Sequence, residues 1–136
     1  FNSAMDRSRP VAAGRLQAIM ELDLSPSICD RKKIAVWFAF WGEVKSRPTY
    51  RKVCEKSDEY YDDVTRGLCD ELIADGKYEG ITGAGVATVL ASITNGLWLA
   101  CLISPKSFDR QEAMNAINEY LQSIFPRHFP VSSIEN

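Results

Sequence analysis

The sequence is poor in the residues that build metal and catalytic centres. Its single histidine, His128, lies in an aromatic, proline-containing tail, and its four cysteines form no CxxC pair. A zinc site or a disulfide framework is therefore not expected, and the cysteines are typical of small buried residues in a reducing compartment. No nucleophile–base pair, GxGxxG motif or P-loop spacing is present. We predict no catalytic residue, no metal and no cofactor, and His128 is interpreted as a surface or packing residue.

A basic excess is also missing. The 136 residues carry 16 Lys and Arg against 18 Asp and Glu. Because phosphate binding requires a basic surface, this chain is not expected to hold nucleic acid by itself. Its length and 46% hydrophobic content fit one globular domain. We assign residues 9–126 to that domain, 1–8 to an N-terminal remnant, tag or linker, and 127–136 to a C-terminal tail.

Strand-like alternation never persists, and the apolar residues recur at helical spacing instead. The predicted fold is all-α, with five helices joined by short connections. Proline, glycine and capping residues set their limits. The predicted helices run from Pro10 to Ser25, from Arg31 to Pro48 with Asp30 as N-cap, from Thr49 as N-cap to Gly76, from Gly85 to Ser104, and from Asp109 to Phe125.

No charged side chain occurs in Gly80–Pro105, the segment around which the chain is organised. At helical spacing it has two apolar faces, which permits a membrane span, a buried central helix, or a helix shared between its own core and a second copy. Ser92, Thr94 and Asn95 fall in mid-segment and no anchoring pattern flanks it, which argues against a span. We favour the shared helix, with no membrane contact.

Aromatic and acidic residues offer two interpretations each. Trp37 and Trp41 lie four residues apart with Phe38 between them, so they build either a thick core, which is the default, or an aromatic-walled cavity. Asp23 either faces solvent or stands at the rim of a pocket. The acidic residues of Thr49–Gly76 are interleaved with basic ones and are interpreted as a solvated face. The buried side of that helix is expected to hold Tyr50, Val53, Tyr61, Val64, Leu68 and Leu72.

Three runs, RLQAIMELDLSPSI, AVWFAFWGEVKSRPTYRKV and SITNGLWLACLI, together resemble the C-terminal half of TetR-family transcriptional repressors of the BetI-like, choline-responsive branch. The likeness spans about residues 14–125. It implies a cytoplasmic, ligand-sensing domain that normally follows a helix-turn-helix DNA-binding domain, which this chain does not contain. Small-molecule binding would release the repressor from DNA.

The resemblance also implies a homodimer in which the last two helices of each subunit form a four-helix interface. The interface residues expected on this basis are Val86, Val89, Leu90, Ile93, Leu97, Ala113, Ile117, Tyr120 and Leu121. A choline-like or other small amphiphilic effector would lie inside each subunit. The expected ligand-binding residues are Asp23, Trp37, Phe38, Trp41, Glu43, Asn95 and Trp98. BetI-like chains often carry an acid where this sequence has Asn95.

The competing hypothesis is a helical protein-interaction module without a small-molecule pocket. It predicts a fully packed interior around Trp37, Trp41 and Trp98, so a closed apolar cavity of a few hundred cubic ångströms there would argue against it.

Overall fold

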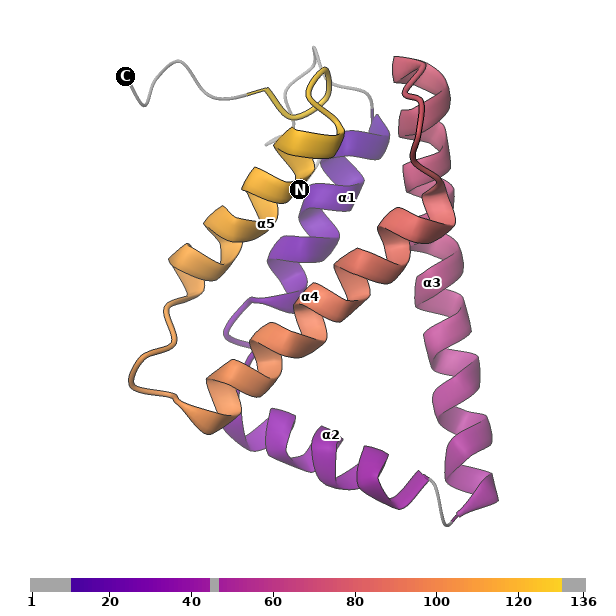
Figure 1. The fold of residues 1–136 in the computed structure, drawn as a ribbon. Coiled ribbons are helices and arrows are strands. Elements are labelled where there is room, and N and C mark those ends of the chain that lie inside the picture. Colours follow the sequence, from indigo (N-terminus) through magenta and orange to yellow (C-terminus); the bar gives the residue numbers. More distant parts are fainter. Residues whose placement is uncertain (1–10, 45–46, 131–136) are drawn as a thin grey trace.

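The protein is described by a computed structural model over residues 11–44 and 47–130. Within these residues the chain forms five α-helices and no strand, which confirms the all-α prediction (Figure 1). The helices are α1 (Val11–Asp23), α2 (Arg31–Val44), α3 (Pro48–Gly76), α4 (Gly83–Ile103) and α5 (Arg110–Ile124).

Helix α4 lies across the other helices and contacts α2, α3 and α5 (Figure 1). Helix α1 packs against α3 and α5, so that α1, α3, α4 and α5 enclose the core, while α2 lies at one end. The largest fully buried side chains come from all five helices and from the turns beside them: Leu16, Ile34, Leu72, Leu90, Ile117, Leu121 and Phe125. The charge-free segment is therefore central to the core, as its composition predicts.

Short polar side chains begin three of the helices. The Lys33 backbone N–H donates to the Asp30 carboxylate at 3.2 Å, and the Gln111 and Glu112 N–H groups donate to Asp109 at 2.8 and 3.1 Å. Both predicted N-caps are confirmed. Helix α4 begins two residues before the predicted Gly85, because the Thr82 hydroxyl accepts from the Gly85 N–H at 3.0 Å.

The start of α3 corrects the prediction, and its end at Gly76 is as predicted. The helix begins with Pro48 in its first turn after Arg47, so Thr49 is not its cap. At the other end Gly76 is the last helical residue, and the left-handed conformation falls on Lys77, with φ of 53°. Of the residues expected on its buried side, Leu68 and Leu72 are buried and Val64 is exposed. The side chains of Tyr50, Val53 and Tyr61 lie outside the described part of the chain.

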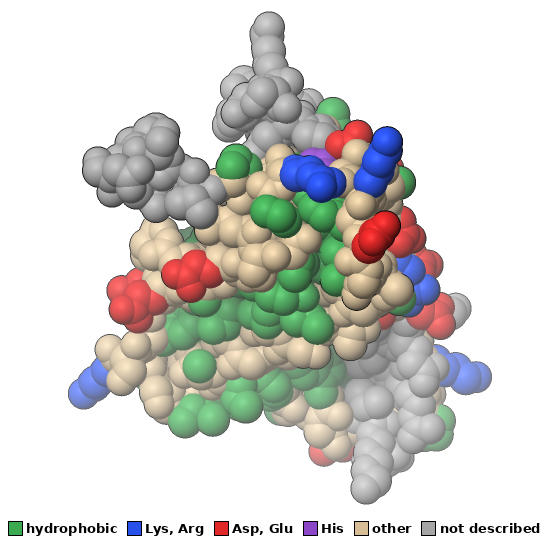
Figure 2. Space-filling view, turned by 45° about the horizontal axis from the view of Figure 1, so that its top comes forward, with side chains coloured by type: hydrophobic (Ala, Val, Ile, Leu, Met, Phe, Trp, Pro, Cys, Tyr) green, Lys and Arg blue, Asp and Glu red, His purple; other side chains and the backbone are tan. Residues whose placement is uncertain are grey.

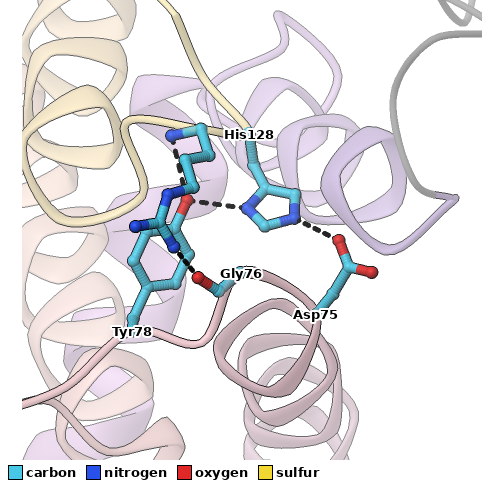
Figure 3. A network of polar contacts seen from close by, with 5 residues as sticks. Asp75, Gly76, Tyr78 and His128 are labelled. Atoms are coloured by element: carbon cyan, nitrogen blue, oxygen red, sulfur yellow. Dashed lines mark hydrogen bonds and ion pairs between the residues drawn. The ribbon is translucent and has the colours of Figure 1, made fainter.

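The segment after α5 packs onto the domain. His128 is buried and its ring bonds both the Tyr78 hydroxyl and the Asp75 carboxylate, each at 2.8 Å (Figure 3). The guanidinium of Arg127 donates to the Gly76 carbonyl and lies over the Tyr78 ring. Residues after 126 therefore pack on the helices at least as far as buried Phe129. His128 is a packing residue, which was one of its two predicted roles.

Candidate functional site

Three of the predicted aromatic residues meet where α2 contacts α4. The rings of Trp41 and Trp98 stack with their centroids 6.5 Å apart and their planes at 24°. The ring of Phe38 meets Trp41 edge to face at 5.1 Å. All three side chains are half-buried. We call these residues, together with Asp23 and Thr94 described next, the aromatic corner.

Asp23 joins the aromatic corner from the last position of α1. Its backbone carbonyl accepts a hydrogen bond of 2.9 Å from the Trp98 indole N–H, which ties α1 to α4. Burial raises the pKa of the Asp23 carboxyl to about 6. Among the described residues its carboxylate has no hydrogen-bond or ion-pair partner. An unpaired carboxylate on the residue whose backbone bonds Trp98 is suited to an organic cation.

Thr94 is a polar residue of this region that sequence reasoning did not assign to the site. It stands one helical turn before Trp98 on the same face of α4 and is only 5% exposed. Its hydroxyl has no hydrogen-bond partner among the residues that the structure describes. Buried hydroxyls are ordinarily satisfied, so this one is free to bond a ligand or water. A threonine in an apolar helix gives no sequence pattern that would have revealed this.

The other predicted ligand residues, Trp37, Glu43 and Asn95, are exposed. Trp37 is 50% exposed and packs on Phe40 and Trp41 along the outside of α2. The Glu43 carboxylate is exposed and pairs with Arg47 at 3.2 Å. Asn95 lies on the exposed face of α4. The Trp37 ring reaches the aromatic corner through Trp41, and a ligand-binding role for these three residues stays a prediction.

The predicted dimer residues divide into two groups. Five of them are already covered by their own subunit and are at most 5% exposed, which leaves no surface for a partner: Val86, Leu90, Ala113, Ile117 and Leu121. The prediction is corrected for these five. Val89 is exposed, and Ile93, Leu97 and Tyr120 are half-buried.

The outer face of α4 carries apolar and small residues but no charge. Val89, Leu99 and Ile103 are 40%, 42% and 68% exposed, and Gly85, Ser92 and Gly96 lie on the same face. The Ser92 hydroxyl donates to the Thr88 carbonyl of its own helix, so it needs no outside partner. Figure 2, turned from the view in which α4 lies in front, shows hydrophobic side chains gathered centrally with charged ones around them.

Two open hollows lie between α1 and α3. The larger, of about 670 Å³, has an apolar floor that includes Ile19, Leu22 and Leu68, with Arg15 and Asp63 among its charged residues. The smaller, of about 540 Å³, lies between Val11 and Asp75. None of the predicted ligand residues lines either hollow.

Helix α4 is also long and apolar enough to cross a membrane by length and composition alone. A core helix of a soluble protein can have the same length and composition, so these two properties do not show whether α4 meets a membrane.

Residues 12–126 match the family model of the BetI-type transcriptional repressor, C-terminal domain. The chain belongs to this family. The match covers most of the domain and includes all five helices but for the first residue of α1. The resemblance carried by the three sequence runs is thereby confirmed, and the apolar α4 is a helix of a BetI-type C-terminal domain.

Curated relatives of this BetI-type domain are HTH-type transcriptional regulators named BetI. The protein from Pseudomonas aeruginosa strain PAO1 is 28% identical over 107 residues, which are 78% of this chain and 51% of the relative. The protein from Paraburkholderia phytofirmans is 27% identical over 112 residues, 81% of this chain and 54% of the relative. The chain thus spans about half the length of the curated relatives it matches.

A crystal structure of a Pseudomonas aeruginosa PAO1 protein has the same fold, with a TM-score of 0.79 and 24% identity. The similarity covers 94% of this BetI-type chain and 63% of that protein.

Proposed function

We propose that this BetI-type domain senses a small quaternary ammonium compound at the aromatic corner and thereby controls a DNA-binding domain outside this chain. The observation that supports it is the combination of an unpaired carboxylate, Asp23, and an unpaired hydroxyl, Thr94, with the stacked rings of Trp41 and Trp98. Groups of this kind are what an organic cation with a polar end requires.

The expected energetics follow from the groups present. Each aromatic face contributes about 0.5 to 2 kcal/mol to holding a cation, more when water is excluded. Asp23 contributes charge, and ligand binding relieves the cost of the unsatisfied Thr94 hydroxyl, which is about 1–3 kcal/mol. Choline carries both a quaternary ammonium and a hydroxyl, so it can address both groups.

The domain is also proposed to hold the repressor together as a homodimer. The outer face of α4 has the small and apolar side chains that close helix packing needs, and a two-fold axis lets one such face cover its copy. Exposed residues Val89, Leu99 and Ile103 take the place of the five buried residues in the predicted interface.

Release from DNA is proposed to follow from a shift in population between two arrangements of the dimer. Two DNA-binding domains must match half-sites about one helical turn apart. A ligand that contacts α1, α2 and α4 together favours the arrangement in which those helices fit it best, and the equilibrium moves by its differential affinity.

The test compares choline with its neutral isostere 3,3-dimethyl-1-butanol by isothermal titration calorimetry and tryptophan fluorescence at pH 7.5. We expect choline to bind at least about tenfold more tightly, because only its cation is attracted by Asp23 and the rings. In Asp23→Asn the difference between the two compounds should shrink. Equal binding of both compounds, or no binding of either, would contradict the proposal.

The protein-interaction alternative is favoured by one observation, the exposure of Val36 and Trp37 on the outside of α2 at 69% and 50%. If this alternative is correct, choline leaves the fluorescence unchanged, and Trp37→Ala weakens the binding of a protein partner while leaving the fold intact.

A further inference from the structure

Helix α2 has an uncovered face at one end of the domain. It lies at the bottom of Figure 1, where α3 and α4 pack against it. Within residues 31–43, whose side chains the structure describes, Ile34 is the one buried residue. Val36 and Trp37 are apolar, yet they are 69% and 50% exposed. Apolar side chains exposed side by side in this way mark an interaction surface.

A single row of side chains runs along this face. Lys32, Val36, Ala39 and Glu43 follow one another at intervals of four, three and four residues, which places them on one side of the helix. All four are exposed. We call these four residues the α2 stripe. It has a cation at one end, two apolar residues in the middle and a carboxylate at the other end.

Aromatic rings lie along one edge of the α2 stripe. The rings of Trp37 and Phe40 meet edge to face with their centroids 6.3 Å apart, and Trp37 also packs on Trp41 at 6.2 Å. These contacts hold the rings in place in the single subunit. Little side-chain freedom is therefore lost when another surface covers them.

The α2 stripe is complementary to its own reverse. When two α2 helices lie antiparallel about a two-fold axis, Lys32 faces Glu43 of the second copy and Val36 faces Ala39 of the second copy. Each of these contacts then occurs twice. The small Ala39 side chain lets the helices approach closely, and the two-fold axis brings the rings of both copies to the same edge of the contact.

We propose that the outer face of α2 docks α2 of a second copy of this chain, in an antiparallel pair about a two-fold axis. This contact uses a different face from the outer face of α4. It depends on neither the effector nor the proposed α4 dimer, and where both contacts form, dimers are joined into larger assemblies.

The charges on this face favour a second copy over an anionic membrane. A helix that lies on such a membrane has Lys and Arg along its polar face. In α2, Lys33 donates to the Ser27 carbonyl at 2.6 Å, so Lys32 is the cation that the stripe presents. At the other end the Glu43 side chain is 57% exposed, even though it pairs with Arg47. A membrane would attract one end and repel the other, whereas an antiparallel copy matches both.

The contact is small, because each copy contributes one helix of 14 residues. Stable interfaces bury more than about 1,000 Å². We therefore expect a dissociation constant on the order of 0.1–1 mM, so that the α2 pair forms at high protein concentration or between domains that are held close together. It does not affect the oligomeric state at micromolar concentration.

The experiment uses Lys32→Glu and Glu43→Lys, each of which places like charges at both ends of the antiparallel pair. Sedimentation equilibrium at low ionic strength, without choline, follows the whole chain from micromolar concentration to about 1 mM. Wild type should form a species larger than the one present at micromolar concentration. Each variant alone should associate about tenfold more weakly, because two attractive charge pairs become repulsive.

An equimolar mixture of the two variants should regain the association. In a mixed pair the two new charges meet each other at one end, and the native charges meet at the other. Lys106→Glu is the control, because it makes the same change of charge at an exposed position between α4 and α5, and it should associate as wild type does. Far-UV circular dichroism checks that each variant retains its helices.

Two results would overturn the proposal. One is a wild type that does not associate further at any concentration, or a mixture no more associated than its separate variants. The other is binding of wild type to phosphatidylglycerol vesicles that Lys32→Glu abolishes and the mixture does not restore. Neither result bears on the effector, since choline is absent from both measurements.

Discussion

A buried hydroxyl without a partner costs free energy, and a fold keeps one only where something offsets the cost. Thr94 is in this position on the inner face of α4. Asp23 also lies in an unfavourable environment, because its carboxyl is partly withdrawn from water and has no opposite charge beside it among the described residues. Both residues therefore oppose stability in the free domain, which is the behaviour expected of a binding site.

The substitution Thr94→Val tests whether the unsatisfied Thr94 hydroxyl lowers the stability of the free domain. The two side chains have nearly the same shape, so the change removes the unsatisfied hydroxyl without leaving a cavity. We expect the free energy of unfolding to rise by about 1 kcal/mol, measured by urea denaturation, and choline affinity to fall. The control is Thr88→Val on the exposed face of α4, where the hydroxyl is bonded to Ala84. If Thr94→Val instead lowers the free energy of unfolding as much as Thr88→Val does, the Thr94 hydroxyl is not the unsatisfied group described above.

Asp23→Asn is expected to change stability in a pH-dependent way. Because the folded pKa of Asp23 is raised from 3.8 to about 6, the protonated carboxyl is favoured on folding. Its contribution to stability is complete below about pH 3.8 and is lost as the pH rises through 6. The neutral asparagine variant should therefore melt at a higher temperature than wild type at pH 7.5, and the difference should disappear near pH 4.

The same pH profile has a consequence for binding. Protonation of Asp23 below about pH 6 should weaken choline binding in wild type and leave the Asp23→Asn variant unaffected. Calorimetric titrations at pH 5 and 7.5 measure this. The exposed Asp62→Asn variant serves as the control for loss of one negative charge. A wild-type affinity that is the same at both pH values would argue against Asp23 as the ligand's partner.

At the scale of elements, the approach of α4 to α3 depends on the absence of one side chain. Gly83 is buried at the start of α4, and a Cβ there would collide with the Asp70 carboxylate and lie 3.0 Å from the Arg66 backbone carbonyl. Backbone cannot move aside as a flexible side chain can. The length of α3 and the apolar content of α4 give no indication of this contact in the sequence.

Gly83→Ala should consequently destabilise the domain. Overpacking of this kind costs about 1–3 kcal/mol, which exceeds the gain of up to about 1 kcal/mol that alanine brings to a helix. The matched control is Gly67→Ala in α3, where a Cβ meets nothing within 4 Å and only the gain remains. Thermal denaturation of both variants measures the contrast, and equal stabilisation of the two would show that the close approach is not as described.

At the scale of the whole molecule, the proposed homodimer depends on the outer face of α4. Gly96→Arg places a long charged side chain on that face, where a Cβ meets nothing within 4 Å in the single subunit. We expect the dimer to dissociate, because a like charge would face its copy across the two-fold axis. Sedimentation velocity at micromolar concentration measures the change. Gly42→Arg in α2 is the control, since that position is equally open, and should leave the dimer intact.

The sedimentation of wild type and of the two arginine variants decides whether the outer face of α4 is the dimer interface. If wild type is a monomer at these concentrations, or if both arginine variants remain dimers, the outer face of α4 is not the interface. A monomer produced only by Gly96→Arg would confirm the face, and a far-UV circular dichroism spectrum would show that the fold is retained.

Local features of the sequence determined the helices. Asp30 and Asp109 cap α2 and α5 as their side chains predict, and proline and glycine place the remaining limits within a few residues, because these effects act within one turn. The family could also be identified, since AFWGE and NGLWL are recognisable as they stand. The N-cap of α3 was misplaced by two residues, at Thr49 instead of Arg47, because threonine is a good cap and proline a good first-turn residue.

Only the tertiary structure decided which side of a helix faces which neighbour. Trp37 and Trp41 are equivalent by spacing, yet Trp41 stacks on Trp98 while Trp37 is half exposed, because α4 reaches only one edge of α2. Likewise α4 has two apolar sides that look alike in sequence. Leu90 belongs to the core and Val89 to the outside, because burial depends on which helices surround α4, and contacts between distant segments set that arrangement.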